Sequence, residues 1–109
     1  MIRHIEAWKF KEYIDGTSAM ENAMELKRQL ESLRRYKVPG LVSMNVQLNC
    51  QRDEMEEAAE SAIYDIVMDS VFSDGQALEA YKEDPAHKKI AEFCESVRLS
   101  RAAVDLIVD

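Results

Sequence analysis

The stretch YKEDPAHKK, residues 81–89, places a tyrosine, a proline and a histidine in one charged segment. Histidine and tyrosine are residue types that exchange or donate protons in active sites. Pro85 lies between them and must kink or split a helix, because it has no backbone N–H to donate. Tyr81 and His87 therefore have two interpretations: a catalytic pair, or a packing tyrosine and a capping histidine at a helix break.

A second group of this kind lies near the amino end. Residues 2–11 have the composition of a strand, and alternation along a strand puts His4, Glu6 and Trp8 on one face. The carboxylate could orient His4 or act as an acid-base group itself, because an unpaired buried carboxylate is costly. The alternatives are a core or interface histidine whose ring is already hydrogen-bonded, and a core tryptophan instead of a pocket wall.

Composition excludes several classes of function. The 109 residues suit one domain, residues 1–109, with 47% apolar and 32% charged residues. A net charge of −7 argues against a nucleic-acid partner, because binding phosphates requires clustered lysine and arginine. No apolar run reaches the roughly 20 residues that cross a membrane, and the amino end is too charged for a signal peptide. We expect a cytoplasmic protein with no membrane partner.

The remaining chemically active groups favour structural roles. Cys50 and Cys94 lack the spacing and histidine neighbours of a zinc site, so we interpret both as structural thiols. The acidic run 50–62 lacks the spacing of a calcium loop and contains alanines, which favours a solvated loop or short helix. We expect no metal.

Periodicity predicts the elements that position these residues. The predicted strands are residues 2–11, 41–49, 63–72 and 101–109. One predicted helix runs from Ser18 to about Tyr36, between the first two strands. A second helix begins at Ser73, breaks at Pro85 and resumes to Val97, between the last two strands. Both helices begin with a predicted capping box, Ser18 with Glu21 and Ser73 with Gln76. Pro39 and Gly40 form the turn before the second strand.

This order predicts an α+β, ferredoxin-like fold (βαββαβ), in which a four-stranded antiparallel sheet has both helices on one face. The other face needs a cover, because a broad apolar patch is rarely left exposed. The apolar positions considered for that patch are Ile5, Ala7, Val42, Met44 and Val46. A two-fold copy of the same chain is the common remedy, so we expect a homodimer.

Four segments carry a family resemblance: MIRHIEAWKFK, VPGLVSMNV, YDIVMDSVF and LEAYKEDPAHKKIAEFCESV. Taken in this order, they resemble the stress-responsive dimeric alpha-beta barrel (Dabb) family over nearly the whole chain, with a departure in the loop at 50–62. The resemblance implies a ferredoxin-like protomer whose sheet packs against that of a second subunit. The order of strands and helices predicts the same architecture.

The resemblance also implies candidate site residues. Olivetolic acid cyclase, a plant polyketide cyclase of this family, is similar at the positions of His4, Tyr81 and His87. In an aldol-type ring closure a histidine would act as general base and a tyrosine would hydrogen-bond the developing oxyanion, with no metal or organic cofactor. The expected lining of the pocket is Glu6, Trp8, Met68 and Ile90.

Three functions follow from these observations. The first is a homodimeric stress-responsive barrel protein with a small-molecule pocket between sheet and helices. The second is a cofactor-independent enzyme similar to polyketide cyclases or monooxygenases. The third is a structural assembly protein that forms larger rings. A shared fold does not choose among them.

Overall fold

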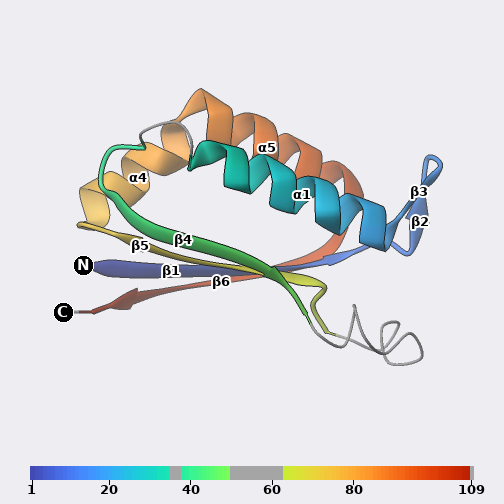
Figure 1. The fold of residues 1–109 in the computed structure, drawn as a ribbon, viewed down its shortest axis with the longest axis horizontal. Coiled ribbons are helices and arrows are strands. Elements are labelled where there is room, and N and C mark those ends of the chain that lie inside the picture. Colours follow the sequence, from blue (N-terminus) through green and yellow to red (C-terminus); the bar gives the residue numbers. More distant parts are fainter. Residues whose placement is uncertain (35–37, 50–62, 109) are drawn as a thin grey trace.

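A four-stranded antiparallel sheet forms the base of the molecule (Figure 1). The structure, a computed structural model, describes residues 1–34, 38–49 and 63–108. The strands are β1 (Ile2–Phe10), β4 (Leu41–Leu48), β5 (Ile66–Phe72) and β6 (Arg98–Ile107), in the spatial order β4-β5-β1-β6. All neighbouring strands are antiparallel. The predicted ferredoxin-like fold is confirmed.

Three helices of the described residues cover one face of this sheet (Figure 1). They are α1 (Ala19–Leu33), α4 (Gly75–Glu83) and α5 (Pro85–Val97). A small hairpin of β2 (Tyr13–Ile14) and β3 (Thr17–Ser18) precedes α1, and the sequence patterns did not predict it. No helix in the described ranges is both long and apolar enough to span a membrane.

The first predicted capping box is confirmed and the second is wrong by one residue. The Ser18 hydroxyl accepts from the Glu21 N–H at 3.1 Å, and the Glu21 carboxylate accepts from the Ser18 N–H at 3.4 Å. The second helix instead uses Asp74, whose carboxylate accepts from the Ala77 N–H at 2.8 Å. Ser73 instead contacts the turn before β4, because its N–H donates to the Gly40 carbonyl at 2.8 Å.

Pro85 divides the last helical region as predicted. It occupies the first position of α5, where its missing N–H would have no helical partner anyway. Asp84 ends α4 and caps α5, because its carboxylate accepts from the Ala86 N–H at 2.8 Å. Tyr81 and His87 therefore lie on two different helices that meet at this break.

The core lies between the sheet and the helices. Alternate residues of β1 and β5 are buried, and Phe10, Phe72, Ile66 and Met68 are fully enclosed. Leu26 and Leu30 of α1 complete it from the helical side.

The assignment of faces on β4 corrects one expectation. Met44 and Val46 are 4% and 3% exposed, so they lie in the core beneath the helices and not on the uncovered face. A shift of register between Leu41 and Ser43 leaves Val42 exposed at the strand's start. The uncovered face instead carries Ile5 and Ala7 with other apolar residues of β5 and β6. The predicted helix end near Tyr36, Cys50 and the loop 50–62 lie outside the described residues.

Candidate functional site: a cavity between sheet and helices

A cavity of about 340 Å³ lies between the sheet and all three helices. Much of its wall is apolar, formed by Trp8, Leu26, Leu30, Met68, Ile90 and Cys94. Its polar wall includes Glu6, Tyr81, His87 and Arg101. A mostly apolar wall with a few convergent polar groups is typical of small-molecule sites.

The structure brings most of the predicted site residues to this cavity. The four expected lining residues, Glu6, Trp8, Met68 and Ile90, all line it. Tyr81 and His87 line it as well, one from each side of the break at Pro85. His4 lies on the same face of the sheet but is not among the lining residues.

Tyr81 and His87 are in direct contact. Their ring centroids lie 4.5 Å apart, and the Phe72 ring centroid lies 5.1 Å from that of Tyr81. The Tyr81 hydroxyl and Nδ1 of His87 are buried and have no hydrogen-bond partner among the described residues. Both residues line the cavity, and each of these two enclosed atoms has an unused hydrogen-bonding capacity.

Burial controls the charge of both side chains. It lowers the pKa of His87, against an opposing effect of Glu6, so the ring is largely neutral near pH 7. It raises the pKa of Tyr81 well above its usual value, and the negative charges of Glu6 and Asp84 add to this. The site therefore offers an uncharged imidazole beside an uncharged phenol.

His4 lies between two carboxylates. Its Nε2 is 2.7 Å from Glu6 Oε1, its Nδ1 contacts Asp105 Oδ1, and the side chain is 2% exposed. Burial alone would lower the pKa of His4, but the hydrogen bonds to Glu6 and Asp105 together outweigh it and raise the pKa. The ring is thus held as an imidazolium across β1 and β6.

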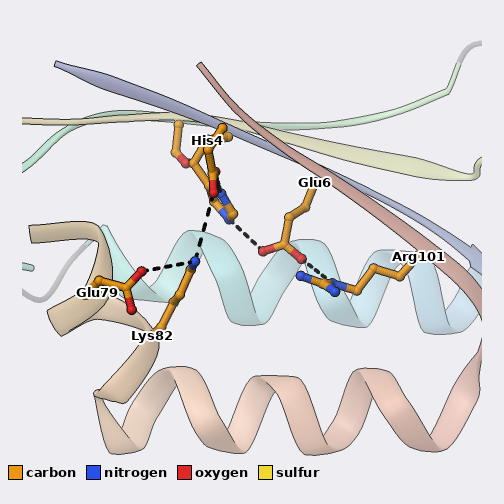
Figure 2. Close-up of polar contacts among 7 residues, drawn as sticks. His4, Glu6, Glu79, Lys82 and Arg101 are labelled. Atoms are coloured by element: carbon orange, nitrogen blue, oxygen red, sulfur yellow. Dashed lines mark hydrogen bonds and ion pairs between the residues drawn. The ribbon is translucent and has the colours of Figure 1, made fainter. Parts of the chain in front are cut away.

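Glu6 lines the cavity and lies between His4 and Arg101, as Figure 2 shows. Its second oxygen accepts from Nε of Arg101 at 2.8 Å. Burial would raise the pKa of Glu6, but the hydrogen bonds from His4 and Arg101 outweigh it and lower the pKa. Glu6 therefore stays ionised with both oxygens engaged, and it is poorly suited to accept a proton from a ligand.

Sequence reasoning missed Arg101, Asp105 and Lys82. Arg101 faces Trp8 and Asp105 faces His4 across the β1–β6 pairing, so strand alternation in 101–109 could have indicated one shared face. Lys82 of α4 lies 4.0 Å from Asp105 Oδ2. It also lies 3.5 Å from Glu79, as Figure 2 shows.

The described residues include side chains of the types that ligate metals and one cysteine, Cys94. The described part of the chain contains no group of three or more His, Cys, Asp or Glu side chains arranged to hold a metal ion. Cys94 lines the cavity as a free, buried thiol, and burial raises its pKa to about 12. Because the thiolate is the nucleophilic form, this thiol is unreactive near pH 7.

Solved structures share this fold. A dimeric ferredoxin-like protein of unknown function from Thermobifida fusca has a TM-score of 0.75 at 18% identity, covering 98% of this chain and 90% of that one. A dimeric ferredoxin-like protein of unknown function from Jannaschia sp. CCS1 has a TM-score of 0.72 at 26% identity, covering 98% of each chain. A hydroxynitrile lyase from Passiflora edulis has a TM-score of 0.73 at 12% identity, covering 99% and 93%.

Among curated proteins, no sequence matches this chain. A family model does match it, over residues 2–108, and that model describes the stress responsive A/B barrel domain. The match includes every strand and helix described above. The chain therefore belongs to the stress responsive A/B barrel domain family.

Proposed function

We propose that the protein is a homodimer that binds a small molecule in the cavity between sheet and helices. The observation that carries this proposal is the pair of buried, unpartnered atoms at the cavity wall, the Tyr81 hydroxyl and Nδ1 of His87. Buried polar atoms in folded proteins are nearly always hydrogen-bonded, and leaving one unpaired costs about 1–3 kcal/mol. A ligand with a hydroxyl or carbonyl group would supply the missing partner once a side-chain rotation turns these enclosed atoms toward the cavity.

The dimeric half of the proposal rests on the uncovered face of the sheet. Val104 and Leu106 of β6 are 48% and 41% exposed there, beside the half-buried Ile5 and Ala7 of β1. A second copy that packs the same face would bury this apolar surface. The related structures from Thermobifida fusca and Jannaschia are described as dimeric, which supports the same arrangement.

Filling the cavity tests ligand binding. Ala91 lines the cavity on α5, whereas Ala86 is exposed on the same helix and does not line it. We expect fragments from a small-molecule library to raise the melting temperature and perturb Trp8 fluorescence in the wild type and in Ala86→Phe, but not in Ala91→Phe. Trp8 is a direct reporter, because it is the one tryptophan of the chain and lines the cavity. Fragments that bind Ala91→Phe equally well, or a library without a binder, would overturn the proposal.

A second candidate function is cofactor-independent proton transfer, as in a cyclase-like or monooxygenase-like enzyme. The specific observation in its favour is the neutral His87 beside the Tyr81 hydroxyl. Nδ1 of His87 would take a proton from a carbon next to a carbonyl, and the electron pair would move onto the carbonyl oxygen. The Tyr81 hydroxyl would donate to that oxygen, and His4 would act as a positioning residue that holds Glu6.

This candidate predicts exchange at carbon. We expect a bound fragment that contains a ketone to exchange its α-hydrogen for deuterium in D₂O, followed by NMR. Exchange should fall about a hundredfold in His87→Ala, while binding changes much less. Wild-type protein that binds such a ketone without accelerating exchange would exclude this candidate and leave the binding function intact.

A further inference from the structure

We propose that the ligand of the cavity is a small amphipathic anion whose carboxylate, or similar oxyanion, binds the terminal N–H groups of Arg101. This inference rests on the proposed binding function and adds the chemical class of the ligand. Three features carry it: the hydrogen bonding of Arg101, the balance of charge at the cavity and the distribution of apolar and neutral polar groups.

Arg101 is held at one end and open at the other. Its Nε donates to Glu6 at 2.8 Å. Among the described residues, this is the single hydrogen bond of the Arg101 side chain. The guanidinium group lies between the sheet and the helices and lines the cavity (Figure 2). A guanidinium has five N–H donors in a rigid plane, so its two terminal nitrogens remain to bind an oxyanion in the two-point manner typical of arginine.

The charges at the cavity favour an anion. Three basic residues, Lys82, Arg98 and Arg101, line it together with two acidic ones, Glu6 and Glu95. The cavity wall is thus slightly basic in a chain with a net charge of −7. Glu6 offers little to a cationic ligand, because His4 and Arg101 already engage both of its oxygens.

The other residues that line the cavity indicate the chemistry of the rest of the ligand. Trp8, Met68 and Ile90 provide an apolar surface for a hydrocarbon or aromatic body. Tyr81 and His87 are uncharged, so they suit a neutral hydroxyl or carbonyl group. A volume of about 340 Å³ accommodates a molecule with one or two rings. The expected ligand is therefore an apolar acid that also has a hydroxyl or carbonyl group away from its acidic end.

Two probes of similar shape, one charged and one uncharged, test the contribution of the ligand's negative charge to binding. We would titrate 6-hydroxy-2-naphthoate and the uncharged 6-hydroxy-2-naphthamide into the full-length protein by calorimetry. We expect the acid to bind at least about tenfold more tightly, because a hydrogen bond to a charged group is worth more than one to a neutral group. Arg101→Gln should remove this preference, and Arg101→Lys should retain part of it.

The control is Arg28→Gln. Arg28 is an exposed arginine on α1 that is paired with Glu25 and does not line the cavity, so this change should leave the preference for the acid unaltered. Thermal melts would check that each variant folds. Because Arg101→Gln also removes a partner of Glu6, Arg101→Lys provides the comparison if Arg101→Gln unfolds.

The outcomes distinguish the two proposals. Equal affinity for acid and amide, or unchanged affinity for the acid in a folded Arg101→Gln, would overturn the anion inference and leave the binding site standing. Failure of both probes where library fragments do bind would have the same consequence. If neither probes nor fragments bind, both proposals fall together.

Discussion

At the scale of single residues, the two histidines of the chain are driven in opposite directions by their surroundings. The carboxylates of Glu6 and Asp105 outweigh the effect of burial at His4 and raise its pKa. At His87 burial dominates and lowers the pKa, since Glu6 only partly opposes it, and His4 and Arg101 add to the lowering. The protonated form of His4 is thus favoured within the fold, whereas the neutral form of His87 is favoured at the cavity.

This contrast predicts a maximum in stability near pH 6.5, the usual histidine pKa in an unfolded chain. Because the folded pKa of His4 is raised, its contribution is fully present below about 6.5 and is lost as the pH rises through the folded value. Because the folded pKa of His87 is lowered, its contribution is present above about 6.5 and is lost as the pH falls through the folded value. Urea unfolding measured across this range should show the free energy of unfolding declining on both sides.

Two variants test which histidine causes the decline in the free energy of unfolding on each side of pH 6.5. His4→Gln should remove the decline above pH 6.5 and lower the free energy of unfolding near pH 6.5 by about 3 kcal/mol, because it leaves the buried Glu6 carboxylate with only one of its two charged partners, Arg101. His87→Leu should remove the decline below pH 6.5. If His4→Gln kept the wild-type slope above pH 6.5, the imidazolium between Glu6 and Asp105 would be refuted.

At the scale of elements, the break between α4 and α5 positions the candidate site. Asp84 caps α5 and Pro85 begins it, so these two residues fix the angle at which Tyr81 and His87 meet. A helix that continued through this point would carry the two side chains on a single axis. The break therefore positions Tyr81 and His87 whether the site binds a ligand or catalyses a reaction.

Removing the Asp84 cap of α5 should weaken ligand binding in the cavity, in addition to lowering the free energy of unfolding. Asp84→Ala and Asp74→Ala each delete a carboxylate that accepts a backbone N–H at 2.8 Å, so each should lower the free energy of unfolding by about 1 kcal/mol. Only Asp84→Ala loosens the junction between Tyr81 and His87. We expect it to weaken binding of cavity fragments severalfold in calorimetry, with Asp74→Ala near the wild type. Equal losses in both variants would show that the junction has no special role.

The turn before β4 requires glycine at position 40. Gly40 has a φ of 78°, and a Cβ built there would lie 2.4 Å from the Ala77 Cβ on α4. Gly40→Ala should therefore destabilise the protein by about 2 kcal/mol or more in urea unfolding, through both steric overlap and the unfavourable φ. Gly40→Ala combined with Ala77→Gly should recover only part of the loss, because the added Cβ would still lie 2.9 Å from Ser73 Oγ and the unfavourable φ would remain. Full recovery in the double variant would show that backbone strain contributes nothing.

These elements also show which features of the fold local sequence patterns can predict. Alternation and capping motifs act locally, so β1, the Ser18 cap and the break at Pro85 could be predicted. The partners of His4 and Glu6 depend instead on the register between β1 and β6, which no local pattern specifies. The same limit explains Met44 and Val46: alternation separated the faces of β4 but did not tell which face meets the helices.

At the scale of the whole molecule, the sheet has one covered and one uncovered face (Figure 1). The uncovered face bears exposed Val104 and Leu106 and also Arg3, which makes a two-point ion pair with Asp69 at 3.0 and 2.6 Å. The Arg3 guanidinium holds the pKa of Asp69 below its usual range, so the pair stays intact near pH 7. Mutually neutralised charges are easier to bury against a second copy than a lone charge would be.

The proposed dimer predicts that one charge on this face separates the subunits. Val104→Asp should convert a species of about twice 12.5 kDa into one of 12.5 kDa in sedimentation at micromolar concentration, because an unpaired carboxylate would enter an apolar interface. Met24→Asp is the control, since Met24 is 49% exposed on α1, on the helical side, against 48% for Val104. The control should remain dimeric, whereas Met44→Asp should unfold the chain because Met44 lies in the core. A wild-type protein that sediments at 12.5 kDa would refute the dimer, and a larger closed assembly would instead favour a structural role.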